Sequence, residues 1–241
     1  MSFFENISSI QNIIYIFSSI LFISGIKMLG KEDTAVRGNF LSALAMFIAV
    51  SVTFINVINP ILVLVGIGIG AIIGSLIALK VKMTSIPEMV ALFNGFGGLA
   101  TFFIAWSEFN SIPSNNFQYL LVMITTYIGG VTFSGSVIAY GKLSETLKVE
   151  KSSIITKLFT TLFYISIIYL LYSIFITKIF SPGFDFYTIL LIFTLLGGVG
   201  FVIPIGGGDM PVVISLLNSF SGISAAFAGL LLLNNVLIVA G

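Results

Sequence analysis

The sequence contains no cysteine and no histidine, and only 8% of its 241 residues are charged. Without cysteine the chain can form no disulfide and perform no thiol chemistry, and without histidine it lacks the commonest metal ligand. We therefore expect neither a metal site nor catalytic residues of these types. A formal net charge of +1 also gives no reason to expect a nucleic-acid partner.

The residues that are present are mostly apolar. Hydrophobic residues make up 58% of the chain and its mean hydropathy is +1.17, whereas soluble domains contain roughly 25% charged residues. We expect an integral membrane protein of the all-α class, a polytopic bundle of transmembrane helices. Runs of about 20 apolar residues, enough to cross a bilayer, lie at 10–28, 39–57, 60–79, 87–106, 117–140, 154–177, 187–205 and 210–233. The sequence thus predicts eight complete spans, and residues 236–241 begin a ninth.

The connections between these spans are short. The longest polar ones, at 27–38, 107–116 and 141–153, are too small to enclose a hydrophobic core of their own. We therefore expect residues 1–241 to form a single transmembrane domain.

Basic residues predict the orientation in the membrane, because they stay on the cytoplasmic side. Nine of the ten lie on one side of the predicted spans, namely Lys27, Lys31, Arg37, Lys80, Lys82, Lys142, Lys148, Lys151 and Lys157. Only Lys178 falls on the other side. The N-terminus is then outside, and the 206–209 connection is cytoplasmic.

A few polar residues lie inside otherwise apolar spans. Counted at about 1.5 Å per residue, Asn94 lies roughly 10 Å and Asn218 roughly 12 Å from the cytoplasmic ends of their spans. Ser134 and Ser136 lie roughly 6 to 9 Å from the same side on a third span. Two interpretations remain open: the four groups line a small hydrated pocket, or they form helix-to-helix hydrogen bonds worth about 0.6 kcal/mol each.

An acidic residue and several glycines complete the pattern. Asp209 stands at the mouth of an apolar span, where a charge is more often kept for an ion, a proton or a partner than for a surface. Glycines also gather at 66–74, 95–98 and 197–200, inside apolar spans. We interpret them as sites of close helix packing rather than as a nucleotide-binding loop.

Three extended stretches, GGGDMPVVISLLNSFSG, PEMVALFNGFGGLA and GGVTFSGSVIAYGKL, resemble the membrane domain of the beta subunit of proton-translocating NAD(P) transhydrogenase. The likeness continues in LGKEDTAVRGN and LLNNVLIVAG. It implies a subunit in a bacterial inner membrane that couples hydride transfer from NADH to NADP+ to inward proton movement. It also implies alpha subunits that bind NAD(H), and a homodimer of the complete enzyme.

The resemblance also assigns roles to residues. Asn218 matches an amide of the proton pathway, Ser134 and Ser136 match a polar part of the fifth span, and Asp209 matches a residue that couples to the NADP(H) domain. Asn94 stands where the family often has a buried histidine, and we expect Asn94, Asn218, Ser134 and Ser136 to lie along the proton pathway. A titrating group is then expected from the alpha subunit's helices, from Asp209 or from ordered water.

The family's membrane domain continues into a soluble NADP(H)-binding domain, which this sequence does not contain. We therefore expect the chain to bind neither NAD(H) nor NADP(H) itself and to need the remaining part of beta as a partner. Two rival classes stay open. One is a secondary transporter or channel for a small solute without redox chemistry, and the other is a membrane anchor, which would have little use for polar groups at depth.

Overall fold

The computed structural model describes residues 2–55, 57, 59–111, 113, 115–148, 153–177 and 183–241, with side chains omitted at 2–9 and 176–177. Lys151 and Lys178, which enter the orientation prediction, lie outside the described residues.

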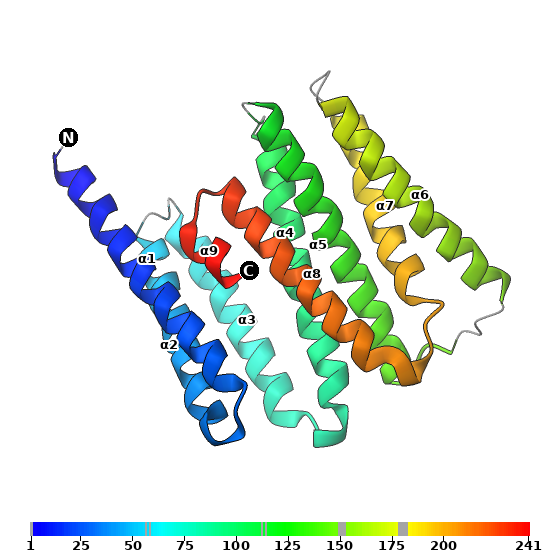
Figure 1. The fold of residues 1–241 in the computed structure, drawn as a ribbon, viewed down its shortest axis with the longest axis horizontal. Coiled ribbons are helices and arrows are strands. Elements are labelled where there is room, and N and C mark those ends of the chain that lie inside the picture. Colours follow the sequence, from blue (N-terminus) through cyan, green and yellow to red (C-terminus); the bar gives the residue numbers. More distant parts are fainter. Residues whose placement is uncertain are drawn as a thin grey trace. The chain divides into compact units, whose positions relative to one another are not determined.

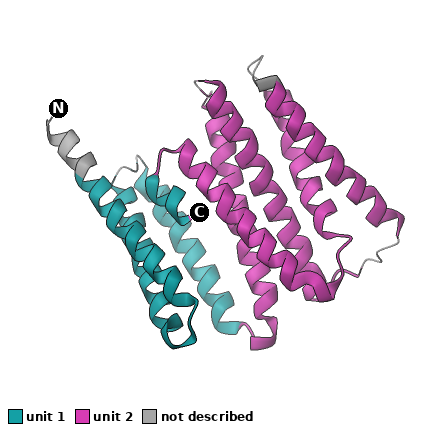
Figure 2. Cartoon of the chain, in the orientation of Figure 1, with its two compact units in different colours: residues 1–80, 235–240 teal, residues 81–234, 241 magenta. Residues whose placement is uncertain are grey.

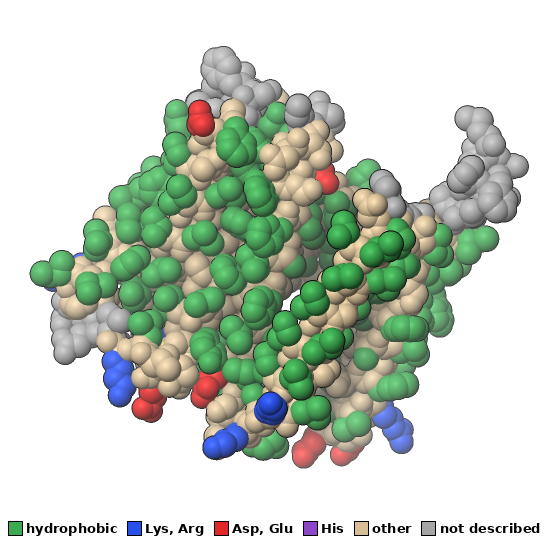
Figure 3. All heavy atoms as spheres, turned by 180° about the vertical axis from the view of Figure 1, so that it is seen from behind, with side chains coloured by type: hydrophobic (Ala, Val, Ile, Leu, Met, Phe, Trp, Pro, Cys, Tyr) green, Lys and Arg blue, Asp and Glu red, His purple; other side chains and the backbone are tan. Residues whose placement is uncertain are grey.

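The described chain is built from helices (Figure 1). They are α1 (Ser2–Leu29), α2 (Glu32–Phe54), α3 (Pro60–Lys80), α4 (Ile86–Asn110), α5 (Asn116–Leu143), α6 (Ile154–Thr177), α7 (Phe184–Val202), α8 (Met210–Leu231) and α9 (Asn235–Ala240), with short 3₁₀ turns at Met83–Ser85 (η1) and Gly207–Asp209 (η2). Within the described residues, α1 to α8 are long and apolar enough to cross a membrane. The prediction of an all-α, polytopic bundle with eight spans is confirmed. Figure 3 shows hydrophobic side chains along the flanks of the helices and charged side chains near their ends.

Most helix ends differ from the predicted spans by a few residues, and two of the differences have a clear local reason. α2 begins at Glu32 rather than at residue 39, because Glu32 and Asp33 in the first turn favour a helix N-terminus. α7 ends at Val202 rather than at residue 205. Pro204 has no N–H to continue the helix beyond that point.

The chain divides into two compact units (Figure 2). Unit 1 comprises Met1–Lys80 and Asn235–Ala240, and unit 2 comprises Val81–Asn234 with Gly241. In unit 1, α1 packs against α2 and α9, and the buried Ser18 hydroxyl donates to the Ala45 carbonyl at 2.6 Å. None of the residues of α3 is buried.

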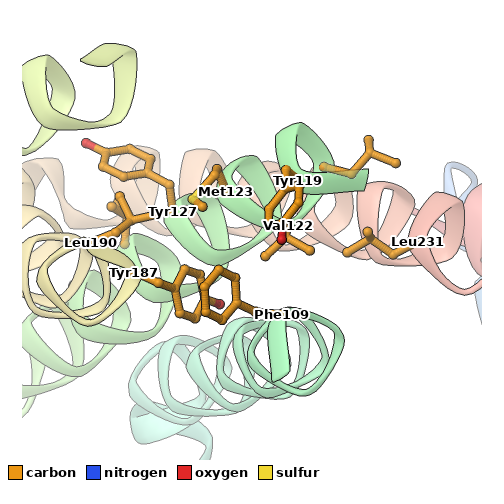
Figure 4. Packing of buried hydrophobic residues seen from close by; sticks show 10 residues of the cluster. Phe109, Tyr119, Val122, Met123, Tyr127, Tyr187, Leu190 and Leu231 are labelled. Carbon is orange, nitrogen blue, oxygen red and sulfur yellow. The ribbon is translucent and has the colours of Figure 1, made fainter. Parts of the chain in front are cut away.

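α5 is the central helix of unit 2. It packs against α4, α6, α7 and α8, and it is the most buried of the spans. Toward its N-terminal end lies an aromatic cluster in which Phe109 of α4 stacks on Tyr187 of α7, with ring centroids 3.9 Å apart (Figure 4). The Tyr187 hydroxyl is hydrogen-bonded to Thr126 of α5 at 2.6 Å. These contacts hold α4, α5 and α7 together.

Glycines set the closest approach in unit 2. A Cβ atom added at Gly98 of α4 would lie 2.8 Å from the Gly129 carbonyl oxygen of α5, and one added at Gly129 would lie 2.8 Å from the Gly98 oxygen. Small residues allow such contact where lipid leaves little hydrophobic drive between helices. The packing interpretation is confirmed for Gly95, Gly98, Gly197, Gly198 and Gly200, where an added Cβ atom would lie 3.0 Å or less from a neighbouring helix. It stays a prediction for Gly97 and the glycines of α3, because a Cβ atom there would meet no described atom within 4 Å.

Gly98→Ala should therefore destabilise unit 2, because the new methyl group must push the α5 backbone away. We expect a cost of about 1–3 kcal/mol, the usual range for overpacking, seen as a lower thermal midpoint of the detergent-solubilised protein. Gly97→Ala is the matched control, since a Cβ atom at Gly97 meets nothing within 4 Å. Equal midpoints for both variants would contradict the close contact of α4 and α5.

Candidate functional site

The Asn94 side chain joins three helices of unit 2. Its Nδ2 atom donates to the Ser136 hydroxyl of α5 at 3.0 Å, and its Oδ1 atom accepts from the Ser221 hydroxyl of α8 at 2.7 Å. The helices α4, α5 and α8 pack pairwise against one another. We refer to Asn94, Ser136 and Ser221 as the amide bridge.

The sequence around Asn94 explains how the bridge forms. Gly95 follows it, and a Cβ atom at Gly95 would lie only 3.0 Å from the Ser136 Cβ atom. The missing side chain thus lets α5 come close enough for Ser136, which is completely buried, to reach the amide. Asn94 and Ser221 are half-buried, so the bridge runs from the interior of unit 2 toward its flank.

A second polar contact joins α4 and α8 deeper in the bundle. The Thr101 and Ser224 hydroxyls lie 2.8 Å apart, and both side chains are buried. The Ser224 hydroxyl also donates to the Ser221 carbonyl at 3.1 Å, which connects it to the amide bridge. Thr101 follows Asn94 by seven residues, so the two contacts are separated by roughly 10 Å along α4.

Two of the four predicted pathway residues come together and two do not. Asn94 and Ser136 are bonded to each other, as their similar depth led us to expect. Ser134 is buried but donates to the Gly130 carbonyl of its own helix at 2.9 Å. The Asn218 side chain is exposed, and its backbone carbonyl lies 2.8 Å from the Ser221 hydroxyl, whose single hydrogen it shares with Asn94 Oδ1.

Helix geometry explains why Asn218 and Ser224 differ. A step of three residues falls about 60° short of a full turn, so a row spaced by three winds around the helix. Asn218, Ser221 and Ser224 form such a row, and they are exposed, half-buried and buried in that order. The sequence reasoning missed Ser221, Ser224 and Thr101. They could have been found from their spacing, because Ser221 and Ser224 follow Asn218 by three and six residues and Thr101 follows Asn94 by seven.

An apolar layer lies between the amide bridge and the start of α8. It consists of Ala91, Ala139, Val202, Met210, Val213, Ile214 and Leu217, contributed by α4, α5, α7 and α8. Water that reaches Asn94 from that end must therefore pass along the half-buried flank of α4 and α8 rather than through this layer.

Asp209 lies at the end of unit 2 where α8 begins. It is the last residue of the η2 turn and is exposed, and its carboxylate does not cap α8. Its backbone N–H donates to the Gly206 carbonyl at 3.1 Å. An exposed carboxylate at a helix start is free to meet a group outside this part of the chain and gains from the helix dipole.

The chemistry available at the amide bridge follows from its groups. Hydroxyls and an amide can donate, accept and hold water, but none of them gains or loses a charge near neutral pH. The bridge can therefore order water molecules but cannot store a proton.

The chain matches the family model of the NAD(P) transhydrogenase beta subunit over residues 11–241. It is 34% identical over 238 residues to the NAD(P) transhydrogenase subunit beta of Rhodospirillum rubrum, and equally to that of the R. rubrum strain ATCC 11170. The alignment covers 94% of this chain and 51% of each relative, so the chain spans about half of their length. This integral membrane protein thus belongs to the family of NAD(P) transhydrogenase beta subunits.

Proposed function

We propose that the chain is the membrane part of a proton-translocating NAD(P) transhydrogenase, in which hydride transfer from NADH to NADP+ is coupled to inward proton movement. Both nucleotides are bound elsewhere, NADP(H) by the remaining part of beta and NAD(H) by alpha subunits. Membership of the beta-subunit family suggests the reaction. The observation in the structure that carries the proposal is the amide bridge, in which Asn94 connects three helices by polar contacts.

In this proposal the amide bridge orders a short water chain. Asn94 holds Ser136 and Ser221 at fixed positions, and Ser224 with Thr101 extends the polar groups deeper along α4 and α8. Water passes the proton between these groups, and the neutral amide avoids the cost of a buried charge. Because hydrogen bonds between membrane helices are worth only about 0.6 kcal/mol on average, water can replace them during turnover.

The exposed face of α8 is suited to binding a partner helix. It carries three polar side chains, Asn218, Ser215 and Ser219, next to the apolar side chains of Val212 and Leu216. A polar stripe facing lipid would be costly. We assign this face to a helix of the alpha subunit, which then supplies the titrating group that this chain lacks, and Asn218 joins the route through that helix.

Substitutions of Asn94 test the proton route. Asn94→Leu removes both contacts of the bridge, and we expect proton pumping by the reconstituted holoenzyme to fall by roughly tenfold, equivalent to about 1.4 kcal/mol on the barrier. Ser136→Ala should show a smaller loss in the same direction. Ser134→Ala is the matched control, since Ser134 bonds only to its own helix. Pumping at the normal rate in Asn94→Leu would exclude the amide bridge from the route.

Asn94→His adds a pH test. Imidazole titrates near pH 6.5, so we expect the pumping rate of this variant to change between about pH 5.5 and 7.5 relative to the unmodified enzyme. The neutral ring above this range can replace the amide, whereas the charged ring below it repels an incoming proton. The rate should therefore fall as the pH is lowered. Parallel pH profiles for the two enzymes would show that residue 94 does not contact the moving proton.

Asp209→Asn tests the link to the NADP(H) domain. The carboxylate is exposed at the rim, so its neutralisation should not disturb folding, but it removes the charge proposed to meet that domain. We expect coupled transhydrogenation in proteoliposomes to fall several-fold at a normal subunit content, with Asp209→Glu retaining most activity. An unchanged coupled rate in Asp209→Asn would remove this residue from the coupling step.

Single cysteines test the proposed orientation, in which the N-terminus is outside. Ser111 and Lys148 are exposed and lie beyond opposite ends of α5, Ser111 before its N-terminus and Lys148 after its C-terminus. The chain has no cysteine of its own. In right-side-out vesicles, Ser111→Cys should react with an impermeant maleimide and Lys148→Cys only after the membrane is opened. The reverse labelling pattern would show that the N-terminus is inside.

A further inference from the structure

Lys142 makes an unusual contact at the end of α5. Its ammonium group donates to three backbone carbonyls, one at the last residue of α7 and two in the segment after it: to Val202 at 3.3 Å, to Ile205 at 2.6 Å, and to Ile203. The side chain is half-buried. The Lys142 side chain thus links α5 by hydrogen bonds to the segment between α7 and α8.

The carbonyls contacted by Lys142 lie at and just after the C-terminal end of α7. The last carbonyls of a helix have no intrahelical partner and carry partial negative charge. The Val202 carbonyl also accepts from the Ile205 N–H at 3.1 Å, so Lys142 adds to a local turn. An ammonium group has three donors, which matches the three carbonyls, and its charge is favoured at the C-terminal end of α7.

The contact lies next to the segment that carries Asp209. Ile205 is held by Lys142, and Met210 is buried in the apolar layer with Ala139 of α5. Between these two fixed points lie only residues 206–209, and a Cβ atom at Gly207 or Gly208 would meet nothing within 4 Å. Lys142 therefore helps to fix the start of the Asp209 segment, together with the Ile205 N–H, which donates to the Val202 carbonyl at 3.1 Å.

The same helix also carries part of the amide bridge. Ser136 precedes Lys142 by six residues, or roughly 9 Å along α5. A displacement of α5 that alters the Asn94–Ser136 contact must therefore also move the Lys142 ammonium group and the carbonyls that it holds. This provides a direct mechanical connection from the bridge to the rim.

We propose that Lys142 is a positioning residue that transmits movements of α5 to the Asp209 segment. The inference rests on the proposed function, since it assigns a coupling role to Asp209 and a transport role to the amide bridge. It goes further in naming the side chain that joins the two sites.

The test compares Lys142→Met, which keeps the length of the side chain but has no donor, with Lys142→Arg, which keeps both charge and donors. Lys148→Met is the matched control, because Lys148 is an exposed lysine six residues later, in the connection that follows α5. Each variant is assembled into the holoenzyme with cysteine-free partner polypeptides. Two quantities are measured: the number of protons pumped per hydride transferred, and the distance distribution between spin labels at Gly208→Cys and Ser111→Cys.

We expect Lys142→Met to broaden the label distances and to lower the proton-to-hydride ratio several-fold at a normal subunit content. Lys142→Arg should restore both, and Lys148→Met should resemble the unmodified enzyme. Broad distances with a normal ratio would show that Lys142 is only a helix cap, and unchanged distances would overturn the contact itself. If Lys142→Met does not assemble, Lys142→Gln takes its place, and a normal ratio in that variant would also overturn the proposal.

The test of Lys142 can fail independently of the test of the proton route. Normal pumping in Asn94→Leu would refute the amide bridge as a path, while the label distances in Lys142→Met would still report on the position of the Asp209 segment. A normal proton-to-hydride ratio in Lys142→Met together with impaired Asn94→Leu would refute only the role of Lys142.

Discussion

The backbone contact between Gly98 of α4 and Gly129 of α5 is the constraint on which the polar site depends. A hydroxyl reaches an amide on a neighbouring helix only when the two backbones lie close together, and side chains larger than glycine would hold them apart here. Asn94 lies one turn before Gly98 on α4, and Ser136 lies two turns after Gly129 on the antiparallel α5. The small residues thus set the geometry, and the hydrogen bonds use it.

The sequence predicted depth in the bundle better than direction around each helix. Depth follows from counting residues along a span, and this placed Asn94 and Ser136 at one level, where they are bonded. Direction depends on which neighbours a helix packs against, and the sequence does not contain that information. Ser134 therefore bonds its own helix and Asn218 faces outward, whereas Ser221, three residues further along α8, occupies the place expected for Asn218.

The eight spans were predictable because a bilayer demands long apolar runs, and composition alone reveals them. Helix ends were harder to place, since they depend on single residues such as Glu32 and Pro204 rather than on a summed property. The contact of Lys142 could not be predicted at all. Its three acceptors are backbone carbonyls 60 or more residues away, and backbone groups leave no pattern in a sequence.

The two charged residues near the α7–α8 connection are suited to different tasks because their surroundings differ. Lys142 is half-buried and its charge is offset by carbonyl dipoles, so moving it away from them would be costly. Asp209 is exposed, and its charge can exchange water for another group at little cost. Glycines at 206–208 give the backbone between the two fixed ends a wide choice of conformations. The backbone at this end of unit 2 is therefore least constrained in the short segment that presents Asp209, because Ile205 before it is held by Lys142 and Met210 after it is buried in the apolar layer.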